Sequence, residues 1–247
     1  MHKLQINERS AVAIMGFNSP EWAIGFIGSL FNNSVVTGIY TTNAPDACHY
    51  QVEHSDAEVI VVETNDMLKR FTLTLKQLPK VKAIVVWGEK ALPAEEKDPR
   101  FFLWKDFMKL GTQIADNVIL EKVPRMRPGE CCCLIYTSGT TGMPKGCMLS
   151  HDSLVWETYP TIQEISKSCP EYPNNGHRIV SYLPLSHIAG LSVDVMSQIL
   201  TGHEVFYARP DALAGTLVQT LQWARPTVFF AVPRVWEKFE DKLKEIG

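Results

Sequence analysis

Residues 131–146 read Cys-Cys-Cys-Leu-Ile-Tyr-Thr-Ser-Gly-Thr-Thr-Gly-Met-Pro-Lys-Gly, an apolar stretch followed directly by small, hydroxyl-bearing and basic residues. The apolar part, residues 131–135, predicts a buried strand. Glycines let backbone N–H groups converge on an anion, hydroxyls donate further hydrogen bonds, and a lysine adds positive charge. The run from Tyr136 to Gly146 therefore predicts a phosphate-binding loop at the end of a strand.

Two other interpretations of this run are weaker. A Walker-type loop needs four residues between its first glycine and Gly-Lys-Ser/Thr. Here Pro144 stands at the required glycine position, and Gly146 follows Lys145. A surface turn is the ordinary meaning of a short Gly/Ser/Thr cluster. In this run, however, eleven consecutive residues follow one pattern of hydroxyl-bearing residues, glycines and a lysine, and this favours the phosphate loop.

Outside the loop, short apolar segments alternate with helical patterns. Strands are predicted at residues 10–17, 35–40, 58–62, 81–87, 178–183, 204–208 and 227–232. Helices are predicted at residues 20–32, 46–54, 65–78, 104–110, from about 152, 191–200, 213–224 and from 234. Ser19 is the expected cap of the first helix, and residues 88–129 are expected to form a connector with one short helix. Repeated β-α-β winding predicts an α/β fold with a largely parallel sheet covered by helices.

Composition excludes several classes of protein. The chain has 247 residues, of which 45% are hydrophobic and 21% are charged, enough for a substantial core. A formal charge of −3 without a basic stripe argues against nucleic acid. The start of the chain lacks a signal-peptide core, and the longest apolar-rich stretch, residues 22–31, is too short for a bilayer. We expect a cytoplasmic protein without a transmembrane segment.

The six cysteines include no C-x-x-C pair, so no metal site is predicted. The Cys131–Cys133 triplet is interpreted as small hydrophobic residues of a strand, with reduced thiols. Ser150, His151 and Asp152 are contiguous and cannot converge as a catalytic triad, so we expect Ser150 to cap a helix. No site is assigned to His49 and His54, because they lie five apart in a helical pattern without the acidic residue of an H-E-x-x-H arrangement.

His187 is a stronger candidate because of its place in the chain. A predicted strand ends at Pro184 and delivers His187 to a loop that opens a helix. Ligands bind at the carboxyl ends of parallel strands. A lone histidine is nevertheless more often structural, so position alone does not assign a role to His187.

The phosphate-loop run resembles the signature of the adenylate-forming enzymes, the superfamily of acyl-CoA synthetases, luciferases and peptide-synthetase adenylation domains. Across nearly the whole chain, further segments resemble the bubblegum branch of acyl-CoA synthetases: residues 16–22, 36–42, 181–189, 210–213 and 232–238. The resemblance implies a partial N-terminal AMP-binding domain over residues 1–247. Its expected portions are a first β-α-β part at 1–87, the connector at 88–129, and the phosphate loop with the acyl pocket at 130–247.

The resemblance also implies the chemistry: ATP and a long-chain or very-long-chain fatty acid form acyl-AMP, and CoA then gives the thioester. Lys145 and His187 are the implied catalytic residues, and Mg²⁺ is the implied metal cofactor, with no ligand assigned in this chain. Apolar residues of 181–200 are expected to form part of the acyl pocket. A peripheral association with the endoplasmic reticulum membrane is compatible with this family. The implied ATP-binding residues are Thr137, Ser138, Gly139, Thr140, Thr141, Gly142, Met143, Pro144 and Lys145.

The chain departs from the family in its extent. It lacks the family's Tyr-Gly-x-Thr-Glu-like and Thr-Gly-Asp motifs and the hinged small domain with its further lysine. We therefore expect an interior part of a larger enzyme's N-terminal domain, or a truncated isoform, and expect the isolated chain to be inactive. Two hypotheses remain open at this point. One is a segment of an acyl-CoA ligase, and the other is a non-catalytic product that at most binds nucleotide or a partner.

Overall fold

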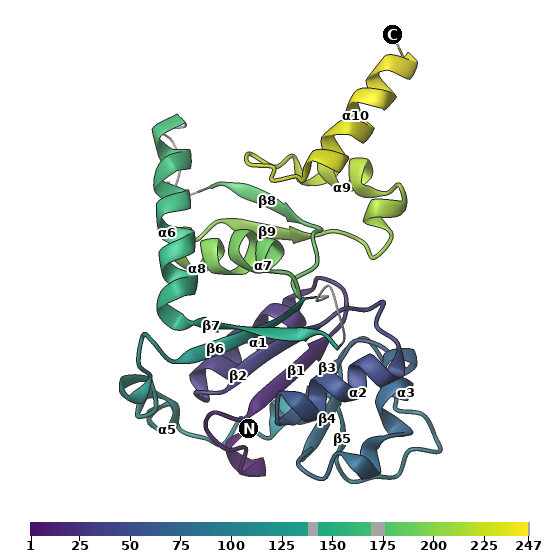
Figure 1. The fold of residues 1–247 in the computed structure, drawn as a ribbon, viewed down its shortest axis with the longest axis vertical. Coiled ribbons are helices and arrows are strands. Elements are labelled where there is room, and N and C mark those ends of the chain that lie inside the picture. The colour runs from purple at the N-terminus through teal and green to yellow at the C-terminus, as the bar shows by residue number, and fades with distance from the viewer. Residues whose placement is uncertain (138–142, 169–175, 247) are drawn as a thin grey trace.

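The computed structural model describes residues 1–137, 143–168 and 176–246 (Figure 1). Its main element is a seven-stranded sheet in the order β5-β4-β3-β1-β2-β6-β7. Neighbouring strands are parallel, except that β6 and β7 are antiparallel. The strands are β1 (Ala11–Met15), β2 (Val35–Ile39), β3 (Ala57–Val62), β4 (Ala83–Val86), β5 (Phe101–Leu103), β6 (Cys131–Thr137) and β7 (Lys145–Ser150). The predicted α/β fold with a largely parallel sheet is confirmed.

Helices cover both faces of the central strands of this sheet and bury them. On one face, α1 (Pro20–Phe31) packs on β1 and α4 (Trp104–Lys109) lies against the same core. On the other face lie α2 (Pro45–His54) and α3 (Asn65–Thr72). All residues of β1 are buried, with alternate side chains in the two cores, as expected for a parallel strand covered on both sides.

Local sequence explains where α1 begins. The Ser19 side chain accepts a hydrogen bond from the backbone N–H of Trp22 at 3.2 Å, and Pro20 occupies the first helical position. Trp22 and Phe26, one turn apart, stack with ring centroids 5.9 Å apart and are fully buried. The predicted cap is confirmed, and this helix is fixed firmly against the sheet.

A second, smaller layer follows the hairpin. The long helix α6 (His151–Ser168) leads to a two-stranded parallel sheet of β8 (Arg178–Ser181) and β9 (Glu204–Tyr207). Between these strands lie α7 (Ile188–Gly190), a π-helical turn at Leu191–Met196 and α8 (Ser197–Thr201). The chain ends with α9 (Leu217–Ala224) and α10 (Pro233–Ile246), which extends away from the rest of the molecule (Figure 1).

The prediction of a strand at residues 227–232 is wrong. This segment does not form a ladder with β8, because its first two N–H groups both bond to the Arg178 carbonyl, at 2.9 and 3.3 Å. Farther along, the segment contacts Tyr182, the residue after β8: Phe229 stacks on its ring, with centroids 5.6 Å apart, and its hydroxyl donates to the Phe230 carbonyl at 3.1 Å. Fixed at these two points, the segment follows the sheet without joining it.

Other elements differ from the expectation in detail. Residues 88–129 hold β5, which pairs with β4, and a second helix α5 (Asp116–Leu120) besides the predicted one. The helix predicted at 191–200 includes the π-helical turn. The helix predicted at 213–224 begins only at Leu217, because Gly215 adopts a φ of 139° that interrupts it. The helix predicted at 65–78 ends at Thr72, and a 3-10 turn follows at Leu75–Gln77.

Two further expectations are confirmed. Cys132 and Cys133 are buried in the sheet core, and burial raises the pKa of the Cys132 thiol to about 12. The Ser150 hydroxyl caps α6 by accepting a hydrogen bond from the Ser153 N–H at 3.0 Å. Among the described residues, no helix is long and apolar enough to span a membrane.

Candidate active site

The predicted phosphate loop joins β6 to β7 as a hairpin. Thr137, the last residue of β6, pairs with Lys145, the first residue of β7, so the two residues mark the two ends of the loop. Both side chains are exposed, and Lys145 forms no ion pair with any described residue. Met143 is exposed and Pro144 is partly buried just before Lys145. The predicted loop residues Ser138, Gly139, Thr140, Thr141 and Gly142 lie outside the described residues.

Tyr136 fixes the base of this hairpin to helix α2. Its hydroxyl lies 2.8 Å from Nδ1 of His54, and its ring lies so close to Gly146 that a Cβ there would be 3.4 Å from it. Burial raises the pKa of the Tyr136 phenol to about 12, so the phenol stays neutral. His54, to which the sequence assigned no site, therefore supports the strand that carries the loop.

His187 caps the short helix α7 with its imidazole. Its Nδ1 accepts a hydrogen bond from the Ala189 N–H at 3.1 Å. Because Nδ1 accepts, the neutral ring carries its proton on Nε2. The side chain is exposed, so Nε2–H is a donor available to a bound molecule. Sequence position predicted the loop that carries His187, and the structure adds which nitrogen donates.

The His187 loop packs directly on the large sheet. A Cβ added to Gly38 in β2 would lie 2.6 Å from Cα of Ser186, and one added to Gly190 would lie 2.5 Å from the Pro184 carbonyl oxygen. Gly38 is one residue before the carboxyl end of β2, and β2 pairs with β6. The His187 loop and the hairpin therefore lie near the carboxyl ends of two neighbouring parallel strands, β2 and β6.

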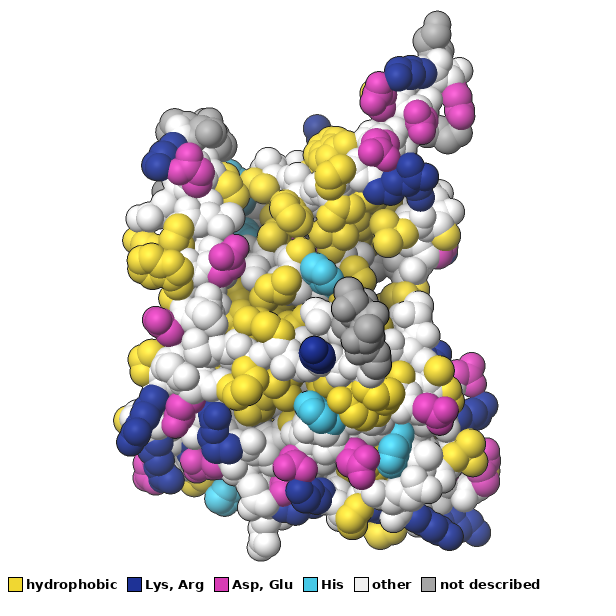
Figure 2. All heavy atoms as spheres, in the orientation of Figure 1, with side chains coloured by type: hydrophobic (Ala, Val, Ile, Leu, Met, Phe, Trp, Pro, Cys, Tyr) yellow, Lys and Arg dark blue, Asp and Glu magenta, His cyan; other side chains and the backbone are white. Residues whose placement is uncertain are grey.

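An apolar cavity of about 770 Å³ begins beside His187. Figure 2 shows the hydrophobic side chains gathered between α6 and the α9–α10 end of the chain, over the second sheet. Ile188 and Ala189, directly after His187, line the cavity, and so does Leu149 of β7. Leu149 is four residues beyond Lys145, which is about 13 Å along a strand. The other lining residues are Ser153, Glu157, Thr158, Thr161, Ile162, Ile165, Ile179, Ser192, Val193, Ser197, Val228, Phe229 and Phe230.

These features lie on neighbouring elements: a cation at the hairpin, an imidazole donor in the loop that packs on β2, and an apolar cavity lined by Leu149, Ile188 and Ala189. Such a set of groups suits a molecule with an anionic head and an apolar tail. Of residues 181–200, which the resemblance assigns in part to an acyl pocket, Ile188, Ala189 and Val193 line this cavity, and their contact with an acyl chain stays a prediction. The contribution of α6 was missed, because its lining side chains are mostly polar and a helix pattern does not reveal from sequence which face lines a cavity.

Asp194 is a further polar residue near this site that sequence reasoning missed. It lies in the π-helical turn and is 5% exposed, and burial raises the pKa of its carboxyl to about 7. The Ser181 hydroxyl donates to the carboxyl, while Oδ2 has no hydrogen-bond partner among the described residues. The signal in the sequence was a single acidic residue inside the apolar run Leu191–Met196.

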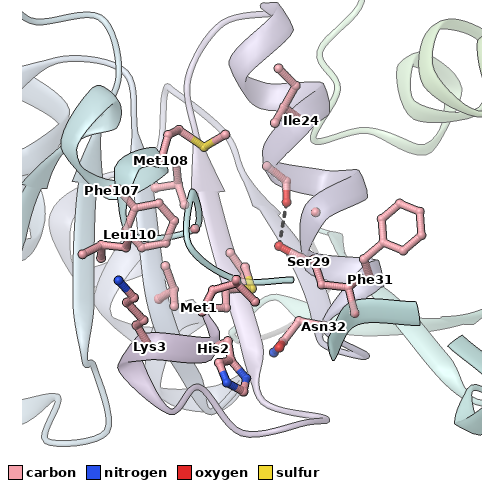
Figure 3. A pocket seen from close by; sticks show the side chains of 18 of the residues that line it. Met1, His2, Lys3, Ile24, Ser29, Phe31, Asn32, Phe107, Met108 and Leu110 are labelled. Carbon is pink, nitrogen blue, oxygen red and sulfur yellow. Dashed lines mark hydrogen bonds between the residues drawn. The ribbon is translucent and has the colours of Figure 1, made fainter. Parts of the chain in front are cut away.

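A second cavity, of about 260 Å³, lies on the α1 face of the large sheet. Figure 3 shows Phe107, Met108 and Leu110 on one side of it and Ile24 and Ser29 of α1 on the other. None of the predicted site residues lines this cavity. It shares no lining residue with the cavity beside His187.

The described residues do not form a metal site. No group of three or more His, Cys, Asp or Glu side chains comes together among them. Lys145 and the His187 donor suit phosphate oxygens.

Comparison with known proteins defines the class. The family described as AMP-binding enzyme matches residues 1–246, and the chain belongs to this family. The solved anthranilate CoA ligase AuaEII in complex with anthranoyl-AMP has the same fold, with a TM-score of 0.74 at 20% identity over 93% of this chain and 41% of that one. The o-succinylbenzoate CoA synthetase MenE of Bacillus subtilis superposes with a TM-score of 0.69 at 16% identity over 97% of this chain and 53% of that one.

Within the family, the chain is similar to ligases for long-chain fatty acids. It is 46% identical over 246 residues to Long-chain-fatty-acid–CoA ligase ACSBG2 of Gallus gallus, covering 99% of this chain and 32% of the relative. It is 41% identical over 247 residues to Long-chain-fatty-acid–CoA ligase ACSBG1 of Homo sapiens, covering 99% and 33%. The chain thus spans about a third of the length of these relatives. The resemblance to the bubblegum branch is confirmed.

Proposed function

We propose that residues 1–247 are the part of a long-chain-fatty-acid–CoA ligase that holds the ATP phosphates and the fatty acid. The observation that carries the proposal is that Lys145, His187 and the apolar cavity lie on neighbouring elements, and these three suit a phosphate, a carboxylate and an acyl chain. The names of the similar ligases support the same substrate class. Activation of very-long-chain fatty acids remains a prediction from the family resemblance.

The proposed reaction has two steps. A carboxylate oxygen of the fatty acid attacks the α-phosphorus of ATP, and the bond to the β-phosphate oxygen breaks, giving acyl-AMP and pyrophosphate. The CoA thiolate then attacks the acyl carbon, and AMP leaves as the thioester forms. In the first step one anion attacks another, so fixed positive charge and donors at the phosphates lower the barrier.

Each described residue has one proposed role. The Lys145 ammonium neutralises charge on the phosphates, and Thr137 is the first donor of the loop. The Nε2–H of His187 orients the attacking carboxylate beside the α-phosphate. ATP is expected to bring its Mg²⁺ with it, and no step is assigned to a metal held by these residues. ATP contacts of Ser138, Gly139, Thr140, Thr141, Gly142, Met143 and Pro144 remain a prediction of the family resemblance.

The cavity is proposed to bury the acyl chain. Its volume of about 770 Å³ lies within the roughly 300–1,000 Å³ common for small-molecule sites. Each buried CH₂ contributes about 0.8 kcal/mol, or about fourfold in affinity.

The location of the protein remains a prediction from the resemblance: the cytoplasm, with peripheral contact to the endoplasmic reticulum membrane.

Purification of the native protein that carries this sequence tests the proposal. We expect ATP–pyrophosphate exchange that requires a fatty acid, with KM falling from octanoate to palmitate as more CH₂ groups are buried. Acetate serves as the control, because it has the carboxylate but no tail. A native product near 27.8 kDa that binds ATP but shows no acid-dependent exchange would overturn the proposal and support the non-catalytic alternative.

A further inference from the structure

Asn18 connects the end of one sheet to the loop that leaves the other. It follows β1 by three residues, immediately before the cap of α1, and is partly buried. Its Nδ2 donates to the Ser181 hydroxyl at 2.8 Å and to the Leu183 carbonyl at 2.7 Å. Its Oδ1 accepts from the Leu185 N–H at 3.2 Å. These bonds join parts of the chain that are more than 160 residues apart.

The three partners require an amide in one orientation. With the amide flipped, Nδ2 would face the Leu185 N–H, and Oδ1 would face the Leu183 carbonyl oxygen. An aspartate of the same shape accepts from Leu185 but cannot donate to Leu183. The site therefore matches asparagine in shape, in donors and in acceptor.

The held segment is the one that ends at His187. Ser181, Leu183 and Leu185 alternate along it, and the His187 N–H closes a turn on the Pro184 carbonyl at 3.0 Å. Below the segment, Gly38 leaves no room for movement toward β2, because Ser186 lies against it. The Asn18 amide and the surface of β2 thus restrain the same short loop from two directions.

We propose that Asn18 is a positioning residue for His187, holding loop 181–187 between the two sheets so that the imidazole donor keeps its place beside the cavity. This inference rests on the proposed function for its catalytic consequence. Asn18 itself contacts no substrate in this scheme. Its effect reaches the reaction only through the placement of His187.

Two variants and one control test the inference in the native protein. Asn18→Asp keeps the shape and removes both donors, and Asn18→Ala removes all three bonds. Asn65→Ala is the matched control, since Asn65 also follows a strand of the large sheet and bonds a backbone carbonyl, that of Ala91 at 3.2 Å, away from the His187 loop.

The decisive readout is single-turnover formation of acyl-AMP from palmitate and ATP. Misplacement by about 1 Å can slow a reaction by about 10²-fold, so we expect Asn18→Asp to lower the rate constant by roughly that factor while the amplitude is retained. A merely structural role would lower the amplitude, as unfolded protein accumulates, and leave the rate constant unchanged. That result would overturn the proposal, as would a wild-type rate constant. Asn65→Ala should retain both rate constant and amplitude.

Hydrogen exchange separates this inference from the proposed function. In Asn18→Asp and Asn18→Ala, amides of residues 183–189 should exchange faster than in wild type and in Asn65→Ala. If the wild-type protein forms no acyl-AMP, the proposed function fails, and faster exchange in the variants still supports the restraint of loop 181–187 by Asn18. Unchanged exchange in both Asn18 variants would show that Asn18 does not restrain this loop, whatever the activity.

Discussion

Lys145 and His187 are held in different ways, and this decides what each can contribute. Lys145 starts a strand, and its exposed ammonium has no ion-pair partner among the described residues, so its charge remains available to a ligand. His187 is restrained at Nδ1 by the Ala189 N–H, which directs its chemistry to Nε2. In the proposed function, Lys145 supplies charge and His187 supplies an oriented donor.

Replacing Lys145 by alanine should slow formation of acyl-AMP by on the order of 10²-fold, because charge developing on pyrophosphate loses its counter-charge. Affinity for the fatty acid should change little, since the apolar cavity begins farther along β7. Acid-dependent pyrophosphate exchange in the native protein measures the effect. Lys109→Ala, which removes an exposed cation of α4, is the control. Wild-type exchange in Lys145→Ala would refute its assignment to the phosphates.

Replacing His187 by alanine should impair adenylation but leave pre-formed acyl-AMP able to react with CoA, because the carboxylate is oriented only in the first step. His187→Gln retains an N–H donor and should recover part of the rate. Assaying the two half-reactions separately checks this. An equal loss in both, with a lower melting temperature, would show that His187 is structural.

The elements around His187 are packed without spare volume. Gly38 of β2 contacts the loop backbone, whereas Gly28 of α1 has no atom within 4 Å of where a Cβ would be. Sheet and loop therefore meet as closely as their backbones allow, and the helix surface at Gly28 is open. Two alanine substitutions of the same size should have opposite effects.

We expect Gly38→Ala to reduce the free energy of unfolding by about 1–3 kcal/mol, because Ser186 has to move. Gly28→Ala should raise it by up to about 1 kcal/mol, since alanine is the better residue inside a helix. Urea titration of both variants measures the difference. If Gly38→Ala is as stable as wild type, the His187 loop does not pack on β2 as closely as described.

The π-helical turn carries a pH dependence through Asp194. Burial raises the pKa of its carboxyl from the ordinary 3.8 to about 7, while Tyr182 and Tyr207 nearby stay neutral with pKa values of about 12. The folded state therefore binds more protons than the unfolded state between about pH 4 and pH 7. The free energy of unfolding should fall across this window as the pH rises.

Asp194→Asn removes the titrating group and should remove this part of the pH dependence. Between pH 5 and pH 8, the wild-type protein should lose about 3 kcal/mol more stability than the variant. Urea unfolding at the two pH values tests this. Equal losses in both proteins would mean that Asp194 does not carry a raised pKa.

At the scale of the whole molecule, large apolar side chains remain on the surface of the second layer. Trp156 of α6 is 75% exposed and Trp223 of α9 is 74% exposed. Exposed apolar area costs about 25 cal/mol per Å² and favours association when it forms patches. The large-sheet layer also exposes apolar side chains, among them Leu73 at 85% and Met148 of β7 at 71%.

Residues 1–247 expressed alone should therefore associate, and should form no thioester from palmitate, ATP, Mg²⁺ and CoA. The chain spans about a third of the length of its ligase relatives and lacks two of the family's motifs. Size-exclusion chromatography with light scattering, together with a thioester assay, checks both outcomes. Sustained, contaminant-free turnover by a monomer would show that the missing motifs are dispensable.

Sequence by itself determined five strands of the large sheet, β1 to β4 and β6, together with the Ser19 and Ser150 caps and the place of the candidate phosphate loop. These features depend on side chains within a few residues of one another: apolar runs, capping hydroxyls, and glycines beside a lysine. The position of His187 at a strand end belongs to the same group. The sequence therefore predicted the class of fold and two of the site's components.

Only the tertiary structure decided how distant segments meet. It turned β7 antiparallel to β6, joined β5 to the edge of the sheet, and left residues 227–232 outside the second sheet. It also brought Asn18 to Leu185 and buried Asp194 beside Ser181. Such contacts depend on the path of the whole chain and on which polar groups find partners when water is excluded, and neither is encoded in a local pattern of residues.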